Sequence, residues 1–370
     1  MKMKTINKFL RTTAVLSVSM NAAYAQHSVS ISTEVDRIEN PLLSNVSPGG
    51  VTLVRVAPSY VFETQGDRIR SRFSAGAVLE RSSNTALLAS RNYPNIGYTW
   101  AYSWPTSSLE LRATLAESAS RNTEFRDLGR VTTDTRERSI VAGAIYEQEL
   151  AARTRMTLSA TNTKVSYDVE SLEGYREQVM SSRFAWEVSD TSAYFFVPSY
   201  SRLTPEESNA VDSQTRWLFG MQATLAPDFS LTAHAGQARS RALQDSPVSL
   251  GLFQLTYLGS RLSPGIEWTK DVAASGFTGS YTETESHGIR LGYRVSEGTT
   301  VLARMTRSKS VGVAGARSRG SAFSLSLESQ LNSRWISTLA FEDRKSEDDI
   351  GNSGKGWSIR AGLAYAFPGR

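Results

Sequence analysis

Near its end the chain reads Trp357-Ser-Ile-Arg-Ala-Gly-Leu-Ala-Tyr-Ala-Phe367, and the side chains alternate between two kinds. One set is apolar and uncharged and ends in aromatic residues: Trp357, Ile359, Ala361, Leu363, Tyr365 and Phe367. The other set is small or charged: Ser358, Arg360, Gly362, Ala364 and Ala366. A period of two is that of a β-strand, and faces of such different polarity indicate two different solvents. At the end of an exported chain, this pattern is typical of the closing strand of an outer-membrane β-barrel.

The N-terminus has the three parts of a secretory signal. A basic region contains Lys2, Lys4, Lys8 and Arg11, and an apolar run follows at Thr13–Met20. Ala23-Tyr24-Ala25 has the small-x-small form of a cleavage site. The apolar run is shorter than the about 20 residues that span a bilayer. We therefore predict a cleaved signal peptide at residues 1–25 and a single barrel domain at residues 26–370, located in the outer membrane.

Composition excludes several classes of function. Residues 1–25 contain four basic and no acidic residues, so their removal lowers the formal net charge from +5 to +1. The basic character therefore belongs largely to the leader, and we predict no nucleic-acid partner. The chain has no cysteine, which excludes disulfides, thiolate metal sites and cysteine nucleophiles. No later stretch is apolar over the roughly 18 residues of a transmembrane helix.

Tight turns recur along the chain at similar intervals. They lie near Gly66, Ser107, Ala152, Asp190, Pro227, Arg261, Gly298 and Ser333. Between successive turns there are two alternating segments and one longer polar loop. Short turns at one end and long loops at the other are typical of a bacterial barrel, with periplasmic turns and extracellular loops.

The alternation predicts an all-β fold, a transmembrane antiparallel up-and-down barrel of about eighteen strands. The predicted strands are His27–Val35, Val51–Glu63, Arg68–Ser82, Tyr93–Trp104, Leu109–Ser120, Arg136–Glu149, Thr154–Asp168, Tyr175–Ser189, Ser192–Leu203, Val211–Leu225, Phe229–Arg241, Val248–Gly259, Leu262–Lys270, Tyr281–Val295, Thr299–Val311, Ser321–Leu331, Arg334–Lys345 and Trp357–Phe367. Sixteen strands is the alternative, because Pro198 and Pro264 interrupt two segments. An even number of strands places both termini in the periplasm. The last strand must then pair with the first to close the barrel.

Aromatic residues are expected in two belts at the membrane interfaces. One group lies near the short turns: Phe62, Trp104, Trp186, Phe229, Tyr257, Tyr293, Trp335 and Phe367. The other lies near the long loops: Tyr93, Phe125, Tyr167, Trp217, Trp268 and Trp357. Tyr365 and Phe367 also form the terminal aromatic pattern of an assembly signal, so we expect the barrel-assembly machinery and outer-membrane lipid as partners.

The charged residues of the strands are expected to face the lumen, because a charge facing lipid at mid-depth costs about 2–4 kcal/mol. The predicted basic residues of the lumen are Arg68, Arg70, Arg72, Arg112, Arg155, Arg183, Arg216, Arg290, Arg294, Arg304 and Arg360. The predicted acidic residues are fewer, namely Glu80, Glu110, Glu187 and Glu328. An arginine-rich wall favours anions. The alternative is that arginines pair across strands with carboxylates and fill the lumen.

The sequence indicates no enzyme. The chain has three histidines, and it lacks the Gly-x-Ser-x-Gly, His-Glu-x-x-His and glycine-rich phosphate motifs. The acidic stretch Glu347–Asn352 lacks the spacing of a calcium loop and is interpreted as a solvated loop. We therefore predict no catalytic residues, no metal and no cofactor.

Three stretches near the predicted start of the mature chain carry a resemblance. They are Val29–Leu43, Val56–Glu63 and Arg72–Glu80. Together they resemble outer-membrane β-barrel proteins found with exopolysaccharide biosynthesis loci, often labelled β-barrel porins. The opening acidic–Asn pair departs from that pattern, being Glu39-Asn40 with Asp36 three residues earlier. The resemblance implies a role in exporting a secreted polysaccharide, with polysaccharide export components as partners.

The leading prediction is accordingly a passive conduit for an anionic or polar polymer. The alternatives are a general diffusion porin for small solutes and a non-conducting structural barrel. The two longest loops, Val35–Gly50 and Arg121–Thr135, discriminate between them. If either loop folds into the lumen as a constriction, a porin is favoured.

Overall fold

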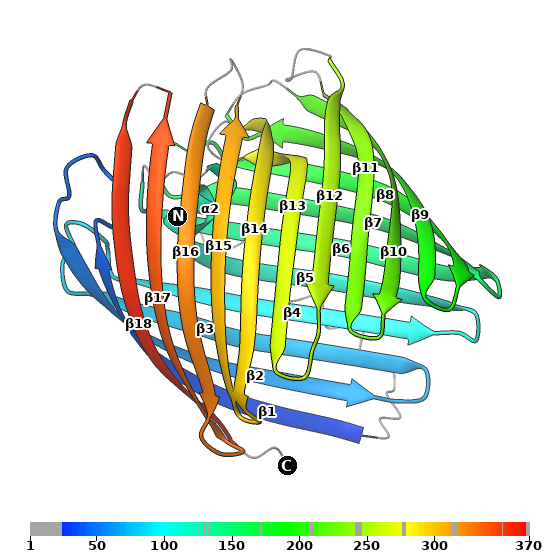
Figure 1. The fold of residues 1–370 in the computed structure, drawn as a ribbon, viewed down its shortest axis with the longest axis horizontal. Helices are drawn as coiled ribbons and strands as arrows, with labels where there is room; N and C mark the ends of the chain where they lie inside the picture. The colour runs from blue at the N-terminus through cyan, green and yellow to red at the C-terminus, as the bar shows by residue number, and fades with distance from the viewer. Residues whose placement is uncertain are drawn as a thin grey trace, which may run out of the picture.

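The strands form one closed antiparallel barrel (Figure 1). The computed structural model describes residues 24–128, 131, 133–170, 172–207, 211–240, 246–275, 279–312, 317–349 and 351–367. The predicted signal peptide, apart from its last two residues, and Pro368–Arg370 lie outside these residues, so signal cleavage stays a prediction. Among the described residues, no helix is long and apolar enough to cross a bilayer.

The prediction of eighteen strands is confirmed, with small changes at the ends. The strands are β1 Tyr24–Glu39, β2 Gly50–Gln65, β3 Ile69–Ser82, β4 Arg91–Ser103, β5 Ser107–Ala119, β6 Arg136–Ala151, β7 Thr154–Tyr167, β8 Tyr175–Ser189, β9 Ser192–Pro205, β10 Asp212–Ala226, β11 Phe229–Ser240, β12 Val248–Tyr257, β13 Leu262–Ser275, β14 Ser280–Ser296, β15 Thr299–Val311, β16 Arg317–Gln330, β17 Trp335–Asp348 and β18 Ser353–Ala366. One helix, α2 Ser120–Leu128, lies between β5 and β6. The alternative of sixteen strands is wrong.

The two prolines are accommodated because each strand pairs regularly on one side. Pro198 of β9 lies opposite Trp217 of β10, while the pairing with β8 is interrupted next to it. Pro264 of β13 lies opposite Leu291 of β14, and the pairing with β12 ends one residue away, at Gly265. Proline lacks an amide donor, so it is tolerated where one neighbour does not need that donor.

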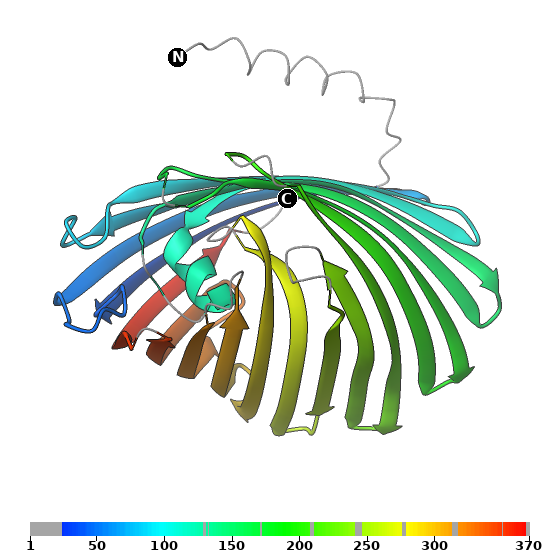
Figure 2. The same cartoon turned by 90° about the horizontal axis from the view of Figure 1, so that it is seen from above.

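The first and last strands close the barrel, as predicted. β1 pairs with β18 from Ser30 opposite Ala366 to Glu39 opposite Trp357. Closure leaves no strand edge unpaired over this length. Viewed from above, β1–β9 form one wall and β10–β18 the other, with the lumen between them (Figure 2).

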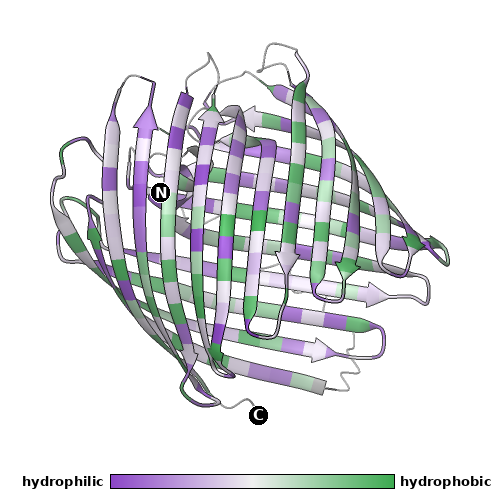
Figure 3. Cartoon of the chain, in the orientation of Figure 1, coloured by the Kyte–Doolittle hydropathy of each residue, from purple (hydrophilic) through white to green (hydrophobic). Residues whose placement is uncertain are grey.

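Hydropathy alternates along the strands, as Figure 3 shows. On β10, Trp217 and Phe219 are both 54% exposed, and on β14 Ile289 is 60% exposed. These large apolar side chains lie on the outside of the barrel. Such exposure would be unfavourable in water and is that of a lipid-facing band. The fully buried apolar residues instead form two clusters toward the long-loop end, inside the wall.

The aromatic end of the chain yields a first prediction. The ring of Tyr365 lies 4.7 Å from the rings of both Trp335 and Phe367, and the Phe367 amide donates to the carbonyl of Val29. We expect Phe367→Ala to lower the amount of folded barrel in the outer membrane severalfold, because it removes the terminal aromatic residue at the closing seam. Heat-dependent gel mobility of the membrane fraction measures this.

The matched control is Phe323→Ala, a lipid-facing phenylalanine of β16 that is 43% exposed. It removes the same side chain away from the closing seam and should insert normally. Deletion of residues 368–370 should also be tolerated. Normal assembly of Phe367→Ala would show that this strand end is not the signal.

Candidate functional site

The segment between β5 and β6 folds into the barrel. Its helix α2 lies between the two walls in Figure 2 and contacts β15 and β16 on the far wall. We expected a loop at Arg121–Thr135, and the helix was not predicted. An eighteen-stranded barrel is wide enough for an aqueous channel, so a segment across the lumen narrows it. Inward folding of this loop is the outcome that favours a porin.

The base of the inward segment is closed by hydrogen bonds between its two ends. The amide of Ser120 donates to the carbonyl of Thr135 over 2.9 Å. In return, the amide of Thr135 donates to the hydroxyl of Ser120 over 3.0 Å. Both residues are buried. The end of β5 and the start of β6 are therefore held together as a rigid base, and this base sets the position at which α2 enters the lumen.

Arg121 is the principal anchor of α2. Its guanidinium donates to both carboxylate oxygens of Glu80 on β3, at 3.0 and 3.1 Å, and also to Asp134. Asp134 in turn accepts from Arg91, and Glu80 from Arg55, each over 2.7 Å. Burial alone would lower the pKa of Arg121, but the carboxylates of Asp134 and Glu80 raise it above its ordinary value. Arg121 thus stays charged, and removing it would leave buried carboxylates less well paired.

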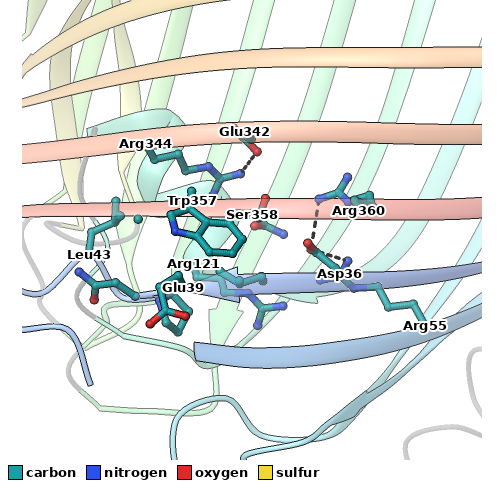
Figure 4. A pocket seen from close by; sticks show the side chains of 15 residues that line it. Asp36, Glu39, Leu43, Arg55, Arg121, Glu342, Arg344, Trp357, Ser358 and Arg360 are labelled. Carbon is teal, nitrogen blue, oxygen red and sulfur yellow. Dashed lines mark hydrogen bonds and ion pairs between the residues drawn. The ribbon is translucent and has the colours of Figure 1, made fainter. Parts of the chain in front are cut away.

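The same network continues along the wall. Arg55 of β2 also pairs with Glu34 and with Asp36 of β1, the latter at 3.2 Å. Arg360 of β18 lies 3.1 Å from Glu34 and 3.5 Å from Asp36. Figure 4 shows Arg55 and Arg360 on either side of Asp36. Ion pairs therefore link β18, β1, β2 and β3 to the inward helix.

A cavity of about 250 Å³ lies between this network and α2 (Figure 4). Its lining includes Asp36, Arg121, Asn122, Arg344 and Arg360. Carboxylate, amide and guanidinium groups together make a strongly polar hollow. Such a surface suits hydrated polar solutes better than apolar ones.

Phe125 of α2 lies inside the barrel rather than in an interfacial belt, which corrects our expectation. Its ring lies 5.0 Å from the guanidinium carbon of Arg344 on β17. This cation–π contact is a second anchor of α2, one helical turn beyond Arg121 and on the same face of the helix. Tyr93 is also misplaced by the belt prediction, because it is buried, with only 4% of its surface exposed, beside the Glu80–Arg121 pair.

The β1–β2 loop, residues 40–49, folds onto the inner face of β18. Asn40 and Leu43 both have a positive φ, near 50°, which turns the chain back toward the wall. The side-chain amide of Asn40 donates through Nδ2 to the backbone carbonyls of Lys355 and Ser44, over 2.9 and 2.8 Å. A Cβ at Gly354 would overlap the backbone carbonyl of Leu43. Glycine is therefore required at position 354 for the loop backbone to approach β18 this closely. The β1–β2 loop thus also narrows the lumen.

The end of the β13–β14 hairpin is a third inward element. β13 pairs with β12 only as far as Lys270, and beyond it the hairpin reaches toward the β9–β12 wall (Figure 2). Tyr281 is fully buried against a cluster of Leu203, Ala238, Leu250 and Val272. The Tyr281 hydroxyl lies 2.6 Å from that of Ser201 on β9, and Asp271 accepts from Arg216 over 2.9 Å. Alternation alone would place Tyr281 on the lipid side.

The register places the predicted lumen residues. Residues opposite each other on adjacent strands point to the same side of the sheet. Glu80 faces inward, because Arg121 of α2 binds it, and following the register from Glu80 around the barrel assigns every strand. The inward face then contains Arg70, Arg72, Arg112, Arg155, Arg183, Arg216, Arg290, Arg294, Arg304, Arg360, Glu110, Glu187 and Glu328. Arg68 instead lies exposed in the turn before β3.

The expectation of few inward carboxylates is wrong. Many predicted arginines are paired: Arg70 with Glu63 at 2.7 Å, Arg155 with Glu147 at 3.3 Å, Arg216 with Asp271 at 2.9 Å, Arg304 with Glu267 at 2.6 Å and Arg360 with Glu34 at 3.1 Å. Much of the arginine wall is thus neutralised across strands, which was the alternative interpretation.

Five inward arginines have no carboxylate within ion-pair distance in the described part of the chain. Arg183 donates to Gln222 and lies 4.3 Å from the Phe195 ring centre, and Arg290 donates to Thr256. The others are Arg72, Arg112 and Arg294. Arg72 and Arg112 both flank Thr99 of β4, so two uncompensated charges lie on adjacent parts of one wall.

Some residues of the site could have been found from the sequence. Glu34 and Arg55 alternate with apolar neighbours in predicted strands, so the rule that placed Arg70 inward also places them. Asp36 lies one residue beyond the predicted end of the first strand at Val35, and the observed β1 extends to Glu39. Arg121 and Asp134 lie in the predicted loop, which has no periodicity, and no local signal identifies them.

His234 lies opposite Gly220, and its ring centre is 6.4 Å from that of Phe195. No group of three or more metal-ligating side chains occurs in the part of the chain that the structure describes.

Comparison with known proteins agrees with the fold. No family model and no curated protein sequence matches the chain. Among solved structures, Acinetobacter baumannii OccAB4 is 11% identical, with a TM-score of 0.55 over 94% of this chain and 99% of its own. The outer membrane protein OpdK of Pseudomonas aeruginosa is 10% identical, with a TM-score of 0.54 over 94% and 100%. The fold is that of an outer-membrane β-barrel. At these identities the likeness concerns the fold alone, and nothing in it connects the chain with exopolysaccharide loci.

The contact at Gly354 gives a second prediction. We expect Gly354→Ala to detach residues 40–49 from β18, because the added methyl would overlap a backbone carbonyl that cannot rotate away. Overpacking of this kind costs about 1–3 kcal/mol. Limited proteolysis of the folded protein should then cut this loop faster.

Gly97→Ala is the matched control, since its Cβ would approach the Ser74 hydroxyl, which can rotate. Equal protection of the loop in both variants would contradict the docked arrangement.

Proposed function

We propose that the protein is a passive outer-membrane channel through which small polar solutes diffuse. The observation that carries the proposal is the inward β5–β6 segment, anchored by Arg121 to Glu80 and in contact with the far wall. Anchoring at both sides makes the constriction a fixed part of the pore. Selection then depends on the width and charge of the narrowed region, with no chemical step.

The inward segments favour small solutes over a threaded polymer. α2, the β1–β2 loop and the β13–β14 hairpin reach inward from different parts of the wall. Each reduces the width available to a chain with many sugar units. The polysaccharide conduit implied by the resemblance is therefore the weaker interpretation. The outer-membrane proteins of similar fold support a membrane location for this chain.

A weak preference for anions is part of the proposal. The ion-paired arginines contribute little net field, because each lies beside a carboxylate. Five inward arginines have no carboxylate at ion-pair distance among the described residues and keep their positive charge uncompensated: Arg72, Arg112, Arg183, Arg290 and Arg294. Guanidinium groups offer hydrogen-bond donors to carboxylate and phosphate oxygens as well as positive charge. Brief contacts of this kind would concentrate anions at the wall and still allow them to leave.

Conductance of the purified protein in planar bilayers tests the proposal. Discrete, long-lived current steps that are ohmic at low voltage are expected for a fixed constriction. Absence of steps, from a preparation shown to be folded by its heat-dependent gel mobility, would indicate a non-conducting structural barrel instead.

A further inference from the structure

Four exposed cationic side chains lie together on the outer face of β15–β18. They are Arg307, Arg319, Lys345 and Lys355, which we call the outer basic cluster. Arg307 and Lys345 both lie opposite Ser321, and Lys345 lies opposite Lys355. All four alternate with inward residues such as Arg304, Arg344 and Arg360, so they point away from the lumen.

The outer basic cluster is largely without partners. Lys355 lies 3.7 Å from Asp343, and the other three form no ion pair with any described residue. Glu347 lies opposite Arg319 in the register, but it is not within ion-pair distance. Clustered like charges repel one another unless an external anion compensates them. An anionic ligand from outside the chain would therefore be stabilised by binding to the outer basic cluster.

The cluster lines a hollow of about 620 Å³. All four cationic residues contribute to its wall, together with Met305, which lies two residues from Arg307 toward the short-turn end of β15. Asn45 and Ser47 of the β1–β2 loop also line it at the rim of the barrel, where Asn45 accepts a hydrogen bond from the amide of Ser353, the first residue of β18. This hollow lies toward the long-loop ends of the strands, near the end of β15 at Val311.

A second hollow, of about 370 Å³, continues from the first toward the middle of the barrel. Met305 and Arg307 line both. The rest of its lining includes Phe253, Ile266, Trp268 and Ile289. Ile289 and Met305 are 60% and 58% exposed, so the groove is open to the lipid side. A cationic pocket thus leads directly into an apolar groove.

We propose that these two hollows bind one outer-leaflet lipid with a phosphorylated headgroup. Its phosphate oxygens would accept hydrogen bonds from Arg307, Arg319, Lys345 and Lys355, and one acyl chain would lie in the groove beside Met305 and Ile289. Arginine binds phosphate well because its planar fork gives two parallel donors. Basic pockets beside apolar membrane-facing surfaces bind anionic lipid headgroups. The inference rests on the outer-membrane location and is independent of conduction.

Native mass spectrometry of the detergent-purified barrel tests this, with diphosphorylated lipid A as the probe. Wild type should retain one lipid molecule. The double variant R307S/R319S should bind it about ten-fold more weakly or worse, because two charge-assisted contacts are lost. The matched control is R202S/R239S, which removes two exposed outward arginines of β9 and β11, away from the hollows.

Further arms separate the possible outcomes. Lipid A without its phosphates should bind as weakly as the double variant does. Inorganic phosphate at matched concentration should displace little of the lipid. If the double variant misfolds by gel mobility, K345S/K355S replaces it. Equal binding by pocket variant and control, equal binding of the dephosphorylated lipid, or full displacement by phosphate would each overturn the proposal.

Discussion

Replacement of Arg121 by alanine is expected to increase single-channel conductance severalfold and to make the open current noisier. Arg121 is 5% exposed and is the link between α2 and Glu80. Breaking a buried ion pair costs about 3–5 kcal/mol. Each 1.4 kcal/mol changes an equilibrium about ten-fold, so the undocked population of α2 would rise by roughly two to four orders of magnitude. The widened lumen would then carry more current.

Arg153→Ala is the control for this change. Arg153 lies in the short β6–β7 turn and pairs with Asp190 at 3.3 Å, with both side chains mostly exposed. Exposed pairs contribute about 0–1 kcal/mol, so its loss should leave conductance unchanged. An Arg121→Ala channel with wild-type conductance and noise would show that α2 does not limit the pore.

The double variant R72Q/R112Q should lose most of the preference for anions. These two arginines flank Thr99 and have no carboxylate partner among the described residues. A unit charge about 10 Å from an ion in water changes its energy by roughly 0.4 kcal/mol, in opposite senses for anions and cations. The two charges together change the difference between anion and cation by about 1.6 kcal/mol before screening. At roughly 0.1 M salt, where the Debye length is about 10 Å, the anion-to-cation permeability ratio should therefore fall by about two- to four-fold. The reversal potential across a salt gradient measures it.

The control removes a neutral pair from the same wall. E63Q/R70Q deletes an arginine together with its partner at 2.7 Å and leaves the net charge of the lumen unchanged. Its reversal potential should stay close to that of wild type. If both variants shift the potential equally, the distinction between paired and unpaired arginines has no effect on selectivity.

The barrel wall could be predicted from the sequence because lipid and lumen impose a period of two on every strand. The bounds of β8 at Tyr175–Ser189 and of β15 at Thr299–Val311 coincide with the predicted segments. The pairing of the last strand with the first also follows, since closure alone removes both edges. Register then places Arg70 and Arg360 on one face.

The constriction could not be predicted in the same way. α2 is held by contacts between residues far apart in the chain, such as Arg121 with Glu80 and Arg344 with Phe125. The periodicity of the sequence carries no information about these long-range contacts. Tyr281 shows the limit of alternation, because it falls on the apolar set of β14 and yet is fully buried where the hairpin leaves the wall.

The charge of the lumen was misjudged for a related reason. Alternation identifies which residues face inward, but pairing depends on which strands are adjacent and on their register. Arg55 meets Glu34, Asp36 and Glu80 from two neighbouring strands. The net field of the wall follows from those pairs rather than from the number of arginines.

Swelling of liposomes that contain the purified protein measures directly whether α2 limits the size of the solutes that pass. Neutral sugars of increasing size separate a constricted channel from a polymer conduit and from a closed barrel. We predict fast entry of monosaccharides, a sharp decline through the short oligosaccharides, and a shift of that limit to larger sugars in Arg121→Ala. Entry of long polysaccharides into wild-type liposomes, or no entry of any sugar, would contradict the account.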